Sequence, residues 1–143
     1  MIWFKEPNLK KINDWCKNTA VDHNGIEIVE AADNSLTGTM PVDHRTVQPQ
    51  RRLHGGVSCV LSESLASIAA NMVLDQSKYV AFGISIEANH LRPAIEGSEV
   101  KGITKPIHLG KTIQVWDTNI YDDRDRLVCS SKLTLAVVKT RSE

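Results

Sequence analysis

Hydrophobic positions along this chain recur with a helical period in two segments and alternate with polar positions in six others. Residues 8–19 carry apolar side chains three to four positions apart, which predicts a short amphipathic helix. Residues 57–74 are apolar apart from serines, Glu63 and Asn71, which predicts a long helix that begins just after His54-Gly55-Gly56. The strand-like runs are 26–29, 35–42, 79–90, 99–106, 112–121 and 127–138.

The order of these elements predicts the class of fold. One long helix followed by an antiparallel run of strands is typical of α+β proteins. A helix that is apolar nearly all round must be covered on most faces, and Glu63 in its middle argues against a membrane span. We therefore expect a single α+β domain over residues 1–143, with a six-stranded antiparallel sheet wrapped around the long helix.

The balance of charge narrows the function classes. Lys and Arg number 17, and Asp and Glu also number 17, so the formal net charge is zero. A general nucleic-acid or membrane-surface binder needs a basic excess, so we expect neither kind of partner. The balance still allows a local cationic patch for a small polyanion such as coenzyme A.

The cysteines and the first residues indicate the compartment. Cys16, Cys59 and Cys129 form no C-x-x-C pair, and residues 1–7 lack the basic and apolar regions of a signal peptide. We therefore expect free thiols in a cytoplasmic protein. The histidines have no metal-ligand spacing, and the chain has neither a G-x-S-x-G nor a G-x-x-x-x-G-K-[ST] motif, so we expect no metal and no cofactor.

Glu63 is the first candidate for chemistry. It is the only charged residue between Arg52 and Asp75, in the middle of a helix that we expect to be buried. Burying a carboxylate costs on the order of several kcal/mol unless it is paired or its pKa moves. The pattern leaves open a catalytic carboxylate, or a structural one that pairs with Arg51 or Arg52 or reaches solvent.

Three neighbouring sites suggest acyl-transfer chemistry. Ser67 shares the helix face of Glu63, so its hydroxyl either positions water or bonds to a helix carbonyl. The His54-Gly55-Gly56 run offers free N–H groups at a helix start, which form either an oxyanion hole or only a tight turn. Gln48 is an amide donor or a solvated loop residue. Gly55 and Glu63 would lie about 12 Å apart on one helix, too far to reach one carbonyl, so a second subunit would have to complete the site.

Taken together, these residues resemble the hotdog-fold acyl-CoA thioesterases of the branch that uses a glutamate on the central helix. Within that branch the chain is most similar to bacterial dihydroxynaphthoyl-CoA thioesterases of menaquinone biosynthesis and to proofreading thioesterases of enterobactin synthesis. The resemblance is nearly full length. Its segments are residues 39–46, 48–49, 53–58, 63–64, 88–93, 106–110, 114–116 and 130–134.

The resemblance implies a hotdog-fold homodimer, usually paired into a homotetramer, that hydrolyses acyl-CoA or aroyl-CoA. It implies that Glu63 is the nucleophile or general base, that Gly55 N–H is the oxyanion donor aided by Gln48 and His54, and that Ser67 positions water. Glu63 and the 48–55 loop would come from different subunits. The residues with an implied CoA-binding role are Gly83, His90, Leu91, Arg92, Pro93, His108, Leu109, Gly110, Lys111, Thr112 and Ile113.

One segment departs from the family's pattern. Gln50-Arg51-Arg52 stands where the family has an aromatic residue and a glycine after Gln-Pro. These cations would narrow the acyl pocket, favour an acidic acyl group or point to solvent. Two other functions stay open, namely hydrolysis of acyl groups on an acyl carrier protein and non-catalytic acyl-CoA binding. Retention of Glu63 favours the enzyme, since a binding module has no need of a buried carboxylate.

Overall fold

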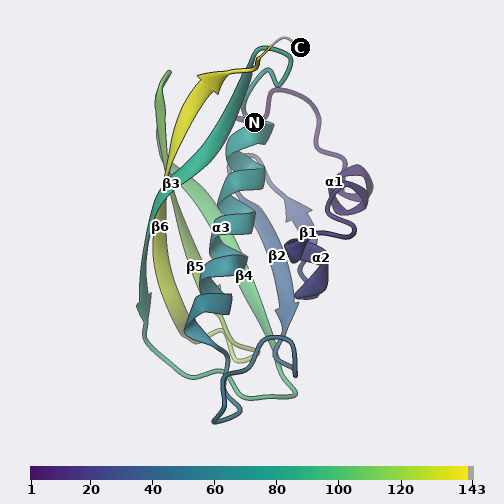
Figure 1. Ribbon diagram of the computed structural model, residues 1–143, viewed down its shortest axis with the longest axis vertical. Coiled ribbons are helices and arrows are strands. Elements are labelled where there is room, and N and C mark those ends of the chain that lie inside the picture. The colour runs from purple at the N-terminus through teal and green to yellow at the C-terminus, as the bar shows by residue number, and fades with distance from the viewer. Residues whose placement is uncertain (142–143) are drawn as a thin grey trace.

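The structure, a computed structural model, describes residues 1–141 (Figure 1). Its helices are α1 (Leu9–Trp15), α2 (Ala20–His23) and α3 (Gly55–Met72). Its strands are β1 (Glu27–Ala31), β2 (Leu36–Pro41), β3 (Tyr79–His90), β4 (Glu99–Leu109), β5 (Ile113–Tyr121) and β6 (Leu127–Lys139).

All six strands join one antiparallel sheet in the order β1-β2-β4-β5-β6-β3. The sheet curls around α3, while α1 and α2 lie beside α3 on the side of β1 and β2 (Figure 1). The expected six-stranded hotdog arrangement around a long central helix is therefore confirmed. The strands β1 and β3 are the two edges of the sheet.

A pair of glycines lets α3 approach the sheet closely. Gly38 of β2 faces Gly102 of β4 in register, and the side chain of Leu65 lies over both. A Cβ atom on either glycine would lie 2.7 Å from a Leu65 methyl group, closer than packed carbons allow. Leu65 is fully buried as a result, and this contact fixes the depth at which α3 sits in the sheet.

Three of the differences from the sequence-based expectations have a local physical reason. The helix predicted over residues 8–19 ends at Trp15, because Asn18 adopts a positive φ of 60° and Thr19 begins α2 by accepting the Val21 N–H. The strand expected to end at Pro106 continues to Leu109 through an irregularity in its pairing with β5, which accommodates the proline. The long helix begins at Gly55 rather than after Gly56, because His54 caps it.

The observed burial also shows that the prediction for one residue of the first helix was wrong. Ile12 is partly buried and Cys16 is buried, but Trp15 is exposed, so it does not share the apolar face expected of it. The cysteines are free thiols, as expected, with Cys16 and Cys129 buried. Among residues 1–141, no helix combines the length and the apolar character that crossing a bilayer requires.

Candidate active site

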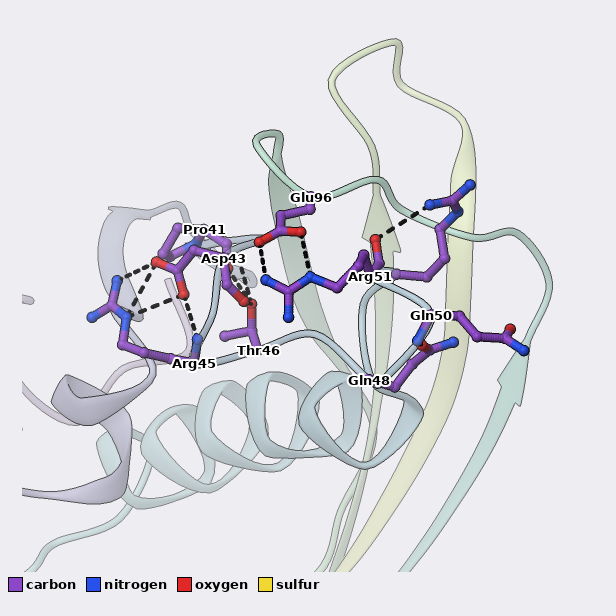
Figure 2. Close-up of polar contacts among 9 residues, drawn as sticks. Pro41, Asp43, Arg45, Thr46, Gln48, Gln50, Arg51 and Glu96 are labelled. Atoms are coloured by element: carbon purple, nitrogen blue, oxygen red, sulfur yellow. Dashed lines mark hydrogen bonds and ion pairs between the residues drawn. The ribbon is translucent and has the colours of Figure 1, made fainter.

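The loop that joins β2 to α3 is fixed by a buried threonine. Thr46 Oγ1 donates to the Pro41 carbonyl at 2.8 Å and accepts the Asp43 N–H at 2.9 Å (Figure 2). The Thr46 carbonyl accepts the His54 N–H at 2.9 Å, which ties the loop to the start of α3. The Arg45 guanidinium hydrogen-bonds to Asp43 and lowers the pKa of that carboxyl.

Gln48 lies at the start of a tight turn in this loop. Its carbonyl accepts the Arg51 N–H at 2.9 Å, and its own N–H donates to the Arg52 carbonyl at 2.8 Å. Arg51 occupies the left-handed region with φ 61° to close the turn. The Gln48 Oε1 accepts the Gln50 N–H, so the side-chain Nε2 is left as a donor that can face a ligand (Figure 2).

The start of α3 leaves one backbone donor open. His54 caps the helix, with its Nδ1 accepting the Gly56 N–H at 2.9 Å. The Val57 and Ser58 N–H groups donate to the His54 carbonyl, whereas the Gly55 N–H has no partner within residues 1–141. Because Nδ1 accepts this hydrogen bond, Nε2 is the ring nitrogen of His54 that can donate. The helix start therefore presents Gly55 N–H at the positive end of the helix dipole.

Gln48 and Gly55, but not His54, border a hollow of about 480 Å³, here called the loop hollow. The His90 ring lies over Gly55, where an added Cβ would come within 3.0 Å of its Nε2. Arg52 and Arg92 also border this hollow, and neither forms an ion pair within residues 1–141. The full lining is Gln48, Gln50, Arg52, Leu53, Gly55, Ser58, His90, Leu91, Arg92, Pro93 and Val128.

Glu63 is half-buried in the middle of α3, against β3. A Cβ on Gly83 would lie 2.6 Å from Glu63 Oε1, so a larger residue at this position would require the carboxylate to move. Glu63 forms no hydrogen bond and no ion pair within the described part of the chain. Arg51 is bound by Glu96, with Nε 2.7 Å from Oε2, so it does not neutralise Glu63 (Figure 2). Pairing with Arg51 or Arg52 is therefore wrong as an interpretation of Glu63.

Glu63 borders a second hollow of about 430 Å³, here called the helix hollow. Ser67 lies beside it, and the Ser67 Oγ makes no hydrogen bond within residues 1–141, so the alternative of a serine bonded to a helix carbonyl is also wrong. Burial, and to a smaller extent the charge of Glu63, raises the pKa of the neighbouring Cys59 thiol. The full lining of the helix hollow is Trp15, Cys16, Thr19, Val21, Glu63, Ser64, Ser67 and Ile68.

The other candidate CoA-binding residues fall at two ends of the sheet. His90 pairs with Cys129 near the start of β6, where Leu91, Arg92 and Pro93 continue into the loop hollow. Ile113 instead pairs with Ala136 near the end of β6. The run that precedes it is His108, Leu109, Gly110, Lys111 and Thr112, closed by a Gly110 N–H to Ile113 carbonyl bond of 2.9 Å. One chain thus does not bring these two runs together.

The residues of the Gln50-Arg51-Arg52 segment, which departs from the family's pattern, differ in what they contact. Arg51 is held by Glu96, 45 residues away in sequence, and so faces away from Gln48 and Gln50 (Figure 2). Arg52 and Gln50 border the loop hollow. Sequence reasoning missed Trp15, which borders the helix hollow although its spacing resembled that of a core residue. Within residues 1–141, no group of three His, Cys, Asp or Glu side chains is arranged to hold a metal ion.

The structure places the two groups of candidate acyl-transfer residues in different hollows. A carboxylate and a hydroxyl border the helix hollow, whereas the oxyanion-type donors border the loop hollow. Both Gly55 and Glu63 belong to α3, so they are about 12 Å apart along its axis at 1.5 Å per residue. Donors must lie about 3 Å from a developing oxyanion, so the two halves within one chain cannot act on the same carbonyl.

Similar proteins agree with this chemistry. The sequence pattern of the thioesterase superfamily matches residues 51–129. The chain is 43% identical to 1,4-dihydroxy-2-naphthoyl-CoA hydrolase of Escherichia coli K12, over 96% of this chain and 100% of that protein. It is 41% identical to the proofreading thioesterase EntH of Cronobacter turicensis, over 96% and 99%. A thioesterase crystal structure from Haemophilus influenzae matches with a TM-score of 0.95 and 43% identity, over 100% and 99% of the two chains.

Proposed function

Since this chain belongs to the thioesterase superfamily, and so is a thioester hydrolase, we propose that it hydrolyses acyl-CoA or aroyl-CoA to the free acid and CoA. The observation that carries this proposal is the uncompensated Glu63 carboxylate beside a free Ser67 hydroxyl. A half-buried carboxylate without an ion pair is costly as structure but is suited to attack or to base catalysis. The E. coli relative that shares 43% identity is itself named as a CoA thioester hydrolase, which supports CoA as the carrier and a place in menaquinone biosynthesis.

In the proposed reaction, Glu63 delivers the attack on the thioester carbonyl. As a general base it takes a proton from water that Ser67 positions, and the resulting hydroxide bonds to the carbonyl carbon. The carbonyl electrons move onto oxygen, where Gly55 N–H and Gln48 Nε2 of a second subunit stabilise the charge. The C–S bond then breaks, and the CoA thiolate takes the proton from Glu63. As a nucleophile, Glu63 would instead form an anhydride that water hydrolyses.

A homodimer would bring the two halves together. The edge strand β3 lies against Glu63 through Gly83 and carries exposed Phe82 and Ile84, so it offers an unpaired strand edge with apolar side chains. Antiparallel pairing of two β3 edges would reverse the second subunit end to end. The His108–Ile113 run of that subunit would then lie at the same end as His90–Pro93, which supports a shared CoA site. A tetramer would be a pair of such dimers.

The cations of the loop hollow favour CoA as the ligand there. Arg52 and Arg92 have no acidic partner within residues 1–141, and phosphate groups bind guanidinium well. The free thiols support action in a reducing cytoplasm.

Release of CoA from benzoyl-CoA, followed with a thiol reagent, tests the proposal directly. An absence of release from benzoyl-CoA and from fatty acyl-CoA, while an acyl carrier protein thioester is hydrolysed, would reject CoA as the carrier. An absence of release from all three would leave only acyl-CoA binding.

A further inference from the structure

The charges that border the two hollows indicate whether the acyl group or the CoA portion of the thioester binds in the helix hollow. Among residues 1–141, Glu63 is the only charged residue that borders this hollow, and the other bordering side chains are apolar or carry a hydroxyl or thiol group. The CoA portion carries phosphates, which the carboxylate would repel and which the arginines of the loop hollow would attract. The reacting carbonyl must come close to Glu63. The acyl group, rather than CoA, therefore belongs in the helix hollow.

Trp15 is one of the residues that border that hollow. This residue is 73% exposed, the largest exposure of any large hydrophobic residue within 1–141, whereas the next residue, Cys16, is buried. Leaving an indole in water forgoes the free energy of burying its surface. An exposed indole at the border of an apolar hollow, next to a candidate catalytic carboxylate, is suited to contact a ligand.

The position of Trp15 is fixed by the elements around it. One residue of α1, Asn13, clamps the helix to β1, since its Nδ2 donates to the Ile28 carbonyl and its Oδ1 accepts the Ile28 N–H, both at 2.9 Å. After α1, Thr19 Oγ1 donates to the Cys16 carbonyl at 2.5 Å and caps α2. The indole is thus held on a clamped backbone at the border of the helix hollow, which reduces the entropy lost when a ligand packs on it.

We propose that Trp15 determines acyl specificity by packing its indole against a planar aromatic acyl group whose carbonyl lies at Glu63. This inference rests on the proposed function. Aromatic rings prefer offset-stacked or edge-to-face contacts that a flexible aliphatic chain cannot make, and an indole offers the largest aromatic surface for them. The α1–α2 segment that carries Trp15 lies outside residues 51–129, which match the superfamily pattern, so it is free to set specificity without altering the shared core.

The test compares Trp15→Ala and Trp15→Phe with the wild type on benzoyl-CoA, hexanoyl-CoA and acetyl-CoA. We expect Trp15→Ala to lower kcat/KM for benzoyl-CoA about tenfold more than for acetyl-CoA, which corresponds to about 1.4 kcal/mol. Trp15→Phe should keep most of the benzoyl-CoA rate, because it keeps an aromatic ring. Phe4→Ala, which removes another exposed aromatic residue away from the helix hollow, should leave all three rates unchanged.

Four outcomes would overturn the role assigned to Trp15. Equal losses on all three substrates would make Trp15 a structural residue. A smaller loss for benzoyl-CoA than for hexanoyl-CoA would exclude aromatic recognition. A change in molar mass of Trp15→Ala, measured by light scattering, would make Trp15 a subunit contact. A wild type that hydrolyses none of the substrates rejects the proposed function itself, whereas an active wild type with an unaffected Trp15→Ala rejects only the role of Trp15.

Discussion

Replacing Gly55 by proline removes one N–H group at a position where the helix tolerates proline. Gly55 is the first residue of α3 after the His54 cap, and proline is common there because its missing N–H has no helical partner. His54 has φ −67° and ψ 129°, the extended conformation that a residue before proline adopts. The substitution should therefore leave the helix intact while it deletes the proposed oxyanion donor.

The expected loss follows from the role of that donor. Removing one oxyanion-hole donor costs about 10²–10³-fold in kcat, and Gln48 would remain to supply the rest. Gly55→Ala is the matched control. It adds the same Cβ, which would crowd the His90 ring at 3.0 Å, but it keeps the N–H. The assay is kcat for CoA release from benzoyl-CoA, with thermal unfolding to check the fold. If Gly55→Pro and Gly55→Ala lose activity equally, crowding at His90 is the cause and Gly55 N–H is not the donor.

Four further predictions test the site and the fold. Glu63→Gln should lower kcat at least about 10²-fold. When the Glu63→Gln protein is refolded together with the Gly55→Pro protein, activity should return, because each mixed dimer would hold one intact site. Well-folded mixtures that stay inactive would exclude a site shared between subunits. Arg92→Ala should raise KM more than it lowers kcat, with a smaller effect at high salt, and an unchanged KM would remove Arg92 from the CoA site. Leu65→Ala should lower the free energy of unfolding by about 2–5 kcal/mol in denaturant titration. A smaller loss would mean that the residues around Gly38 and Gly102 close around the alanine. Burial raises the pKa of Asp122, but hydrogen bonds from Arg126 and Arg124 outweigh burial and hold this pKa below its ordinary value of 3.8. The ionised Asp122 carboxylate therefore stabilises the fold at pH values above about 3.8. This stabilisation is lost as the pH falls through the lowered pKa. The stability difference between wild type and Asp122→Asn should therefore shrink in acid, and a difference independent of pH would refute the linkage.

The sequence predicted the sheet and the central helix because both follow from local periodicity. Six alternating runs became six strands, and the lone carboxylate of an apolar helix marked the position that β3 accommodates with Gly83. The same periodicity misplaced Trp15, because helical spacing shows which residues share a face but not how far the protein covers that face.

Features that depend on distant contacts were beyond the sequence. One interpretation of Glu63 was an ion pair with Arg51 or Arg52, and the sequence could not show that Glu96 binds Arg51 from across the fold. The distance between the His90–Pro93 and His108–Ile113 runs was likewise hidden, because it follows from strand order rather than from either motif. The family resemblance named these residues but not their arrangement in one chain.

The placement of Glu63 and Gly55 in separate hollows has a genetic consequence. Under the proposed pairing, each dimer holds two sites, and each site takes one residue from either subunit. A subunit that lacks only Glu63 would still lend its Gly55 to a normal partner and leave one working site. A subunit that lacks both would silence both sites of any normal partner. An allele with both substitutions would therefore be dominant in a cell that also carries the wild type. An allele with either single substitution would be only partly dominant, because its mixed dimers keep one working site.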